Sequence, residues 1–261
     1  MDMPVGVENT FDYFAEWLQS PLGRYLLAEE AAWFDRTTAD IFGYKAVQLE
    51  LPQMDCLRAN RMPWRTLVGQ SAGTRVRCCG EFLPFEAQSI DLLVMPHVLD
   101  YCTDPHQVLR EAERVLVPEG RLLITGFNPW SLWGLKRFKH KQHEVPWRGQ
   151  FISLPRLKDW LSLLNLESMR GEYLLYSLPV QREKWLTRSK FLEDAGDRWW
   201  PAAGGVYCLD VVKRVRGVRM IEPKWRRVPT PTTAPAAAID KAGDARIERL
   251  QQQAAKDRCK P

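Results

Sequence analysis

The stretch from Ser89 to Trp133 constrains the fold most, because two apolar runs enclose an amphipathic segment. Ile90 to Met95 and Arg121 to Phe127 contain almost no polar alternation, which is typical of parallel strands that are buried on both faces. Between them, Asp104 and Pro105 predict the start of a helix. The apolar residues that follow at helical spacing are Val108, Leu109, Ala112, Val115 and Leu116.

The ends of this segment define the connection between the two strands. Gln107 is placed to close a capping box at the helix start, while Pro118 and Gly120 predict its end. A crossover of this length implies neighbouring parallel strands with a right-handed connection. The sequence therefore predicts a doubly wound, mostly parallel α/β sheet. Ligands of such sheets bind beyond the carboxyl ends of the strands, here at residues 95–97 and 126–129.

The same region carries an ordered set of short motifs. They are LPF at 83–85, SID at 89–91, PHVL at 96–99, DPHQVLREAERVL at 104–116, PEG at 118–120 and GFNP at 126–129. This set resembles the second half of class I S-adenosylmethionine-dependent methyltransferases, specifically those with a type 11 methyltransferase domain. One small departure is Glu119, where the family usually has glycine. The resemblance implies a Rossmann-like fold and S-adenosylmethionine as the cofactor.

The resemblance also implies where the cofactor would bind. The matching positions are Gln48, Glu50, Gln70, Cys79, Glu81, Met95 and Pro96. The glycine loop that the family has after its first strand is absent, since Glu50 and Pro52 stand where small residues are expected. Glu50 would either bind the ammonium group of the cofactor or block its site. Gln70 replaces the acid that holds the ribose, and Cys79 replaces an acid near the adenine, for which Glu81 is the substitute.

His97 follows the central strand, beside the expected position of the sulfonium group. Its imidazole suits either a wall of the substrate pocket or removal of a proton, so His97 is also the candidate catalytic residue. A histidine that caps the following turn is the alternative, and we favour the pocket wall. The expected substrate pocket consists of His97, Tyr101, Asn128 and Trp130.

The remaining elements follow from periodicity and from Gly and Pro punctuation. We expect helices from Thr10, at Pro21–Phe34, Asp35–Ile41, Pro52–Ala59, Leu154–Leu164 and Glu183–Glu193, and strands at 43–52, Trp64–Gly69, Arg75–Cys79, Leu166–Leu178 and Gly204–Lys213. The connection at Gln70–Thr74 is too short for a crossover helix.

Composition divides the chain into three parts. We expect an N-terminal helical cover at 1–43, a methyltransferase-like α/β domain at 44–218 and a disordered, basic, Pro/Ala-rich tail at 219–261. Lys213–Pro261 contains 13 Lys/Arg and 5 Asp/Glu, so its net positive charge is larger than the net charge of +5 of the whole chain. The remaining residues therefore carry a net negative charge, and the basic character belongs to the tail.

Residues 128–150 form a long connection in which Trp130, Trp133 and Trp147 alternate with Lys and Arg. A substrate lid is the favoured interpretation, ahead of packing on the sheet and of a nucleic-acid surface. Six cysteines show no metal-ligand spacing, so no metal site is expected. Without a signal peptide or an apolar run that could span a membrane, we expect a cytoplasmic protein with reduced thiols.

The predicted function is methyl transfer from S-adenosylmethionine to a small molecule. Two alternatives remain: a catalytically silent relative that serves as a binding or scaffold protein, and a methyltransferase that acts on RNA. The missing glycine loop favours the first alternative, whereas the basic loop and tail favour the second. The sequence indicates neither the methyl acceptor nor the oligomeric state.

Overall fold

A computed structural model describes residues 8–139, 145–176, 203–215 and 247–253. The chain divides into two units, Met1–Arg216 and Gly217–Pro261. In the second unit the described residues 247–253 are an exposed helix, and they lie within the predicted tail. The rest of that tail and the predicted helix at Glu183–Glu193 lie outside the described residues. No helix in the described parts is long and apolar enough to cross a membrane.

A seven-stranded sheet is the centre of the first unit, and its strand order is β3-β2-β1-β4-β5-β7-β6. The strands are β1 (Lys45–Leu49), β2 (Trp64–Gly69), β3 (Val76–Arg77), β4 (Ile90–Pro96), β5 (Leu116–Phe127), β6 (Leu166–Leu174) and β7 (Val206–Lys213). β7 runs antiparallel between β5 and β6, and the other pairs are parallel. The predicted doubly wound, mostly parallel sheet is confirmed. Its strand order reverses between β1 and β4, which is where such sheets bind ligands.

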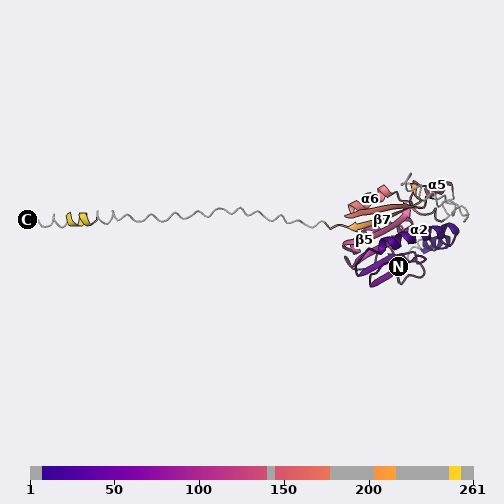
Figure 1. Cartoon of the computed structure of the whole chain (residues 1–261), viewed down its shortest axis with the longest axis horizontal. Helices are drawn as coiled ribbons and strands as arrows, with labels where there is room; N and C mark the ends of the chain where they lie inside the picture. The colour runs from indigo at the N-terminus through magenta and orange to yellow at the C-terminus, as the bar shows by residue number, and fades with distance from the viewer. Residues whose placement is uncertain (1–7, 140–144, 177–202, 216–246, 254–261) are drawn as a thin grey trace, which may run out of the picture. The chain divides into compact units, whose positions relative to one another are not determined.

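Helices cover both faces of this sheet. They are α1 (Glu8–Trp17), α2 (Pro21–Thr38), α3 (Val98–Tyr101), α4 (Pro105–Val115), α5 (Leu132–Lys139) and α6 (Leu154–Leu163). Apolar residues of α1 and α2, among them Phe14 and Leu26, share a core with one face of β1, β4 and β5. Leu109 of α4 and Leu157 of α6 belong to the core on the other face. In Figure 1, α2 and α6 accordingly lie on opposite sides of β5 and β7.

Several predicted boundaries are wrong. β5 begins at Leu116 rather than Arg121, because Leu116 already pairs with Ile90 ahead of a register shift. β3 has only two residues, and β6 ends at Leu174. α2 continues to Thr38, whose hydroxyl bonds the carbonyl of Phe34, so no separate helix starts at Asp35. The expected helix at Pro52–Ala59 is a series of turns.

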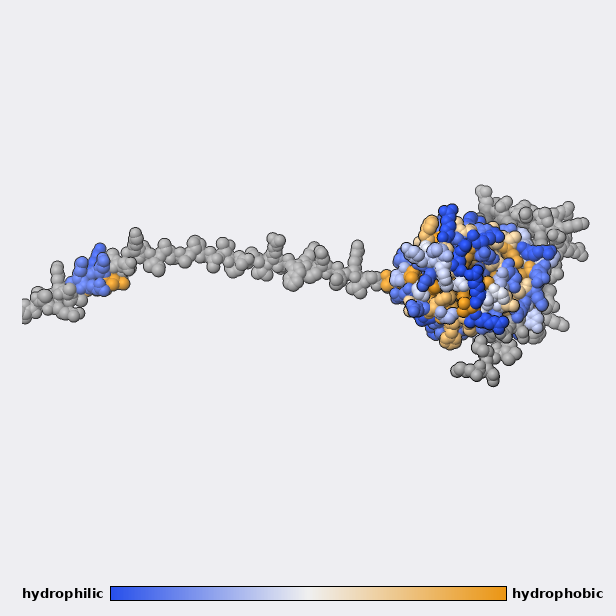
Figure 2. Space-filling view, turned by 90° about the horizontal axis from the view of Figure 1, so that it is seen from below, coloured by the Kyte–Doolittle hydropathy of each residue, from blue (hydrophilic) through white to orange (hydrophobic). Residues whose placement is uncertain are grey.

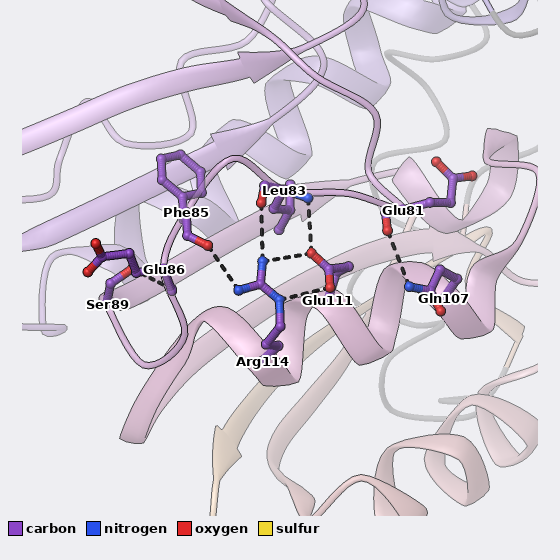
Figure 3. Close-up of polar contacts among 8 residues, drawn as sticks. All are labelled: Glu81, Leu83, Phe85, Glu86, Ser89, Gln107, Glu111 and Arg114. Carbon is purple, nitrogen blue, oxygen red and sulfur yellow. Dashed lines mark hydrogen bonds and ion pairs between the residues drawn. The ribbon is translucent and has the colours of Figure 1, made fainter. Parts of the chain in front are cut away.

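The predicted start of α4 is confirmed in part. The Asp104 carboxylate accepts hydrogen bonds from the amides of His106 and Gln107, and Pro105 occupies the first turn. Gln107 does not close a capping box, because its side-chain amide donates instead to the Glu81 carbonyl at 3.4 Å (Figure 3). α4 is thus tied to the loop that precedes β4.

The edge of the sheet at β2 and β3 is less covered than its centre. Neither the β1–β2 nor the β2–β3 connection contains a helix, as expected for the short second connection. A cavity of about 340 Å³ lies beside β2, with Gln48, Leu67 and Arg75 in its wall. On the face of the folded unit shown in Figure 2, apolar residues form small patches between polar ones.

Candidate functional site

Backbone strain marks the carboxyl ends of β1 and β4, next to the point where strand order reverses. Glu50 and Leu51 follow β1 with φ angles of 61° and 58°, and His97 follows β4 with a φ of 52°. Residues other than glycine rarely adopt this left-handed conformation, which costs on the order of 1 kcal/mol or more each. Such positions concentrate at functional sites. These three residues therefore point to the expected site.

The loop after β1 is organised by one buried side chain, Gln48. Its amide nitrogen donates to the carbonyls of Glu50, Leu51 and Met54 at 2.8–3.1 Å. Its amide oxygen accepts from the backbone N–H of Cys56 at 2.9 Å. Both ends of the Gln48 amide are therefore used to shape the loop that replaces the family's glycine loop.

Glu50 joins the end of β1 to the end of β2. Its carboxylate accepts from the amides of Gln70 (2.6 Å) and Ser71 (3.2 Å) and from the Ser71 hydroxyl (2.6 Å). Burial raises the pKa of Glu50, while the hydrogen bonds from Ser71 and Gln70 lower it. The carboxyl group fills the space above Gly69, where an added Cβ would lie 2.4 Å from its Cδ atom.

Gln70, Cys79 and Glu81 lie side by side beyond β2 and β3. The side chain of Gln70 interacts with the Cys79 thiol, and that thiol donates to the Glu81 carboxylate. Burial, with the hydrogen bond to Glu81, raises the pKa of Cys79 to about 11, so the sulfur keeps its proton at neutral pH. The side-chain oxygen of Gln70 is buried and has no hydrogen-bond partner. An acceptor is therefore available where the family binds ribose.

An arginine on α4 holds the LPF loop in place (Figure 3). The Arg114 guanidinium donates to the carbonyls of Phe85 at 2.9 Å and Leu83 at 3.1 Å. It also pairs with Glu111, whose carboxylate accepts from the Leu83 amide at 3.0 Å. Arg114 thereby links two of the sequence motifs, LPF and ERVL, through direct contacts. This clamp fixes the loop that carries Glu81.

At the end of β4, Met95 and Pro96 are buried, and His97, which follows the strand, is completely enclosed. The His97 Nε2 atom lies 2.7 Å from Glu30 Oε1 of α2, and Nδ1 lies 2.8 Å from Asp100 Oδ2. Although burial lowers it, the charge of Glu30 and the hydrogen bond with Asp100 raise the pKa of His97 to about 9. His97 is therefore a cation at neutral pH, with both ring N–H groups bound to carboxylates.

The second carboxylate oxygens of this cluster, Glu30 Oε2 and Asp100 Oδ1, have no hydrogen-bond partner. Phe14 and Phe127 surround the imidazole, with ring centroids 5.3 and 4.3 Å from it. Glu30 was not foreseen from the sequence, although a signal exists. It interrupts the apolar stripe of α2 one turn after Leu26, and a charge in that position marks a buried polar partner.

The other predicted pocket residues lie in different environments. Tyr101 is buried and donates to the carbonyl of Pro146. Asn128 is also buried; its amide donates to the carbonyl of Gly204 and its oxygen accepts from the Trp130 amide at 3.0 Å. Trp130 itself is 79% exposed. The structure thus brings His97 and Tyr101 under α1 and α2 and places Trp130 on the surface.

Within the long connection after β5, packing explains two of the three tryptophans. Trp133 and Trp147 are buried in the core beside α1 and α2. Lys136 lies over the Trp147 ring at 5.6 Å, and Arg137 lies over Phe151 at 5.0 Å. These cations and aromatic rings contact one another within the protein. Among the described residues, no group of three or more His, Cys, Asp or Glu side chains is arranged to hold a metal ion.

Comparison with known proteins agrees with this architecture. Residues 47–124 match the methyltransferase domain family. The chain is 46% identical over 90 residues to the uncharacterized protein YafS of Escherichia coli (strain K12). The aligned segment covers 34% of this chain and 38% of YafS. The chain is 38% identical over 84 residues to the ubiquinone/menaquinone biosynthesis C-methyltransferase UbiE of Bartonella tribocorum, 30% of this chain and 31% of UbiE. The chain thus spans only 38% of YafS and 31% of UbiE.

Two solved structures share the fold over most of their length. One is a possible histamine N-methyltransferase of Thermotoga maritima, with a TM-score of 0.54 and 18% identity over 73% of this chain and 93% of that one. The other is a putative Haloferax volcanii methyltransferase in complex with the Trm112 activator, with a TM-score of 0.55 and 16% identity over 79% and 98%. At these identities the similarity concerns the fold alone. Residues 47–124 thus resemble a methyltransferase domain, and the described part of the chain has the fold of class I S-adenosylmethionine-dependent methyltransferases.

The residues at the strand ends fit S-adenosylmethionine only in part. The unpaired Gln70 oxygen fits a ribose hydroxyl, because it is a buried acceptor without a partner. The β1 end does not fit in the observed arrangement. Glu50 fills the space over Gly69, and Pro52 packs near Gly73, whose added Cβ would lie 3.5 Å from the proline ring. The close backbone approach that a glycine loop gives a ligand is therefore missing.

Proposed function

We propose that this chain is a methyltransferase that uses S-adenosylmethionine and acts on a small molecule. One observation carries the proposal: within the segment that matches the methyltransferase domain, Gln70 follows the carboxyl end of the parallel strand β2 and has a side-chain oxygen without a hydrogen-bond partner. The cofactor would supply the methyl group.

The acceptor is proposed to be a small molecule for two reasons. The relative UbiE is a C-methyltransferase of ubiquinone and menaquinone biosynthesis. In addition, Lys136 and Arg137 of the long loop lie over aromatic rings of the protein itself, whereas Arg148 is exposed. The arrangement of Lys136 and Arg137 is compatible with a lid and gives less support to an RNA surface, which would display cations and aromatic rings together to solvent.

The chain's own contribution is position and exclusion of water. Methyl transfer gains much of its rate from holding two reactants in line, without a conspicuous acid or base. We propose that His97 acts in this way rather than as a base, because its ring already carries a proton at neutral pH. Through Glu30 it holds α2 over the carboxyl end of β4. Asp100, in turn, accepts from the Phe127 amide at 3.0 Å and joins the end of β5 to the same cluster.

Calorimetric titration with S-adenosylmethionine and S-adenosylhomocysteine tests the proposal. We expect dissociation constants in the micromolar range, weakened about tenfold in Gln70→Ala, since one hydrogen bond to the ligand is lost. Gln53→Ala is the matched control, because Gln53 is an exposed amide in the loop after β1. It should leave binding unchanged.

Absence of binding at millimolar ligand would contradict the proposal. It would favour the catalytically silent relative, for which the filled β1 end is the specific observation. Binding that Gln70→Ala and Gln53→Ala leave equally unchanged would show that the ligand does not use the Gln70 oxygen.

A further inference from the structure

A second cavity, of about 390 Å³, lies between the starts of α4 and α6 and the loop after β5. Its aromatic residues are Trp130, Phe151 and Trp160, and its polar side chains include His106, Gln150 and Arg156. It is separate from the network of Glu50, Gln70, Cys79 and Glu81, none of which lines it. The volume falls in the range of small-molecule pockets.

Trp130 is presented to this cavity by a rigid turn. Asn128 accepts from the Trp130 amide, and the Asn128 carbonyl accepts from the Ser131 hydroxyl at 2.6 Å. The Ser131 oxygen in turn accepts from the amide of Gly134, inside α5. These bonds hold the backbone while the indole remains 79% exposed. An exposed indole whose backbone is held in place beside a cavity binds a flat apolar group with little loss of conformational entropy.

Another part of the cavity wall contains Trp160, which packs against His106 and Arg156. The rings of His106 and Trp160 have centroids 3.9 Å apart, and the Arg156 guanidinium lies 5.2 Å from the Trp160 ring. A guanidinium that rests on an indole keeps its N–H edge free for a carboxylate.

The charge around the cavity favours an anion. Among the residues that the structure describes, no acidic side chain lines the cavity and Arg156 has no ion-pair partner. Asp104, the N-cap residue before α4, has its carboxylate occupied by the amides of His106 and Gln107. The helix starts at Pro105 and Ser153 add the positive ends of two helix dipoles.

We infer that this cavity binds an aromatic carboxylate, with the ring between Trp130 and Trp160 and the carboxylate on Arg156. A role of this ligand as the methyl acceptor rests on the proposed function, whereas its binding does not. The binding itself requires no cofactor, so it is measured in the absence of S-adenosylmethionine.

The test uses 4-hydroxybenzoate and its neutral counterpart 4-hydroxybenzamide as probes of the full chain. Binding is followed by the indole ¹⁵N–¹H signals of the tryptophans, assigned with Trp130→Phe and Trp160→Phe. We expect saturable shifts of the Trp130 and Trp160 signals with the acid, and at least tenfold weaker binding of the amide, a difference of about 1.4 kcal/mol.

Arg156→Gln should weaken binding of the acid about tenfold and leave the amide unchanged. Lys158→Gln is the matched control, because Lys158 is an exposed cation on the same helix that does not line the cavity. The inference is overturned by equal affinity for acid and amide, by unchanged binding in Arg156→Gln, or by an equal loss in Lys158→Gln. If the acid binds while S-adenosylmethionine does not, the inference stands and the proposed function fails.

Discussion

At the scale of single residues, the sequence did not predict the surroundings of two ionisable side chains, Glu50 and His97. Glu50 was expected either to bind the cofactor or to block its site, and the structure shows its carboxylate occupied by Gln70 and Ser71. His97 was expected beside the cofactor, and its ring is held between Glu30 and Asp100. The long-range partners explain both differences, because Gln70 and Ser71 approach Glu50, and Glu30 approaches His97, only in the folded protein.

The His97 cluster gives stability a defined dependence on pH. The folded pKa of His97 is about 9, above the usual 6.5, so its contribution is fully present below pH 6.5 and is lost as pH rises through 9. A shift of this size corresponds to about 3 kcal/mol. We expect urea unfolding, followed by circular dichroism, to show a fall of that order between pH 6.5 and pH 9.5.

The variant His97→Gln should abolish this fall, whereas His106→Gln, a change at an exposed histidine, should keep it. The charged groups that face the His97 ring are Glu30 and Asp100, and the nearby Tyr101 and Tyr207 have pKa values raised well above 10 by burial. The tyrosines therefore do not titrate in this range. An unaltered fall in His97→Gln would exclude His97 as its source.

The Arg114 clamp predicts a local loss of stability. Arg114→Ala removes donors from the carbonyls of Leu83 and Phe85 and the partner of Glu111. We expect a loss of about 1–2 kcal/mol in the free energy of unfolding, since Arg114 is partly exposed and water replaces some of the bonds. Arg110→Ala, an exposed arginine on the same helix, is the control and should cost less than 0.5 kcal/mol, roughly the surface value. Equal losses would contradict the clamp.

At the scale of elements, the existence and order of the strands were predictable, whereas several bounds, including the start of the central strand β5, were not. Three strands, β2, β4 and β7, have both ends within two residues of the prediction, because apolar runs and glycines define these ends. The absence of a helix at residues 52–59 was not predictable from local pattern. There the Gln48 amide, which forms bonds to four backbone groups, overrides the helical spacing of Met54 and Leu57.

Helix capping gives a prediction at this scale. The Ser20 hydroxyl accepts from the Gly23 amide at 3.1 Å at the start of α2, whereas Ser153, at the start of α6, makes no side-chain cap bond. Ser20→Ala should therefore lower the midpoint of thermal unfolding by an amount equivalent to about 1 kcal/mol, and Ser153→Ala by clearly less. Similar losses in the two variants would refute a specific role for the Ser20 cap.

For the whole molecule, the ordered motifs from Leu83 to Pro129 predicted the fold, which is confirmed, and a resemblance to methyltransferases, whose domain model matches residues 47–124. The site was predicted in part. Positions Gln70, Cys79 and Glu81 do converge, because the ends of parallel strands lie along one edge. Gln48 was expected at the cofactor and instead supports a loop, because its direction depends on turns that no periodicity encodes. Whether any of these residues touches a cofactor stays a prediction.

We propose above all that S-adenosylmethionine binds beside Gln70, which follows the carboxyl end of β2. A crystal structure grown with S-adenosylhomocysteine tests it most directly. We predict density for the ligand beside the Gln70 side chain, with a ribose hydroxyl on its now unpaired oxygen. Ligand bound elsewhere, or its absence at millimolar concentration with Glu50 still bonded to Gln70 and Ser71, would contradict the claim.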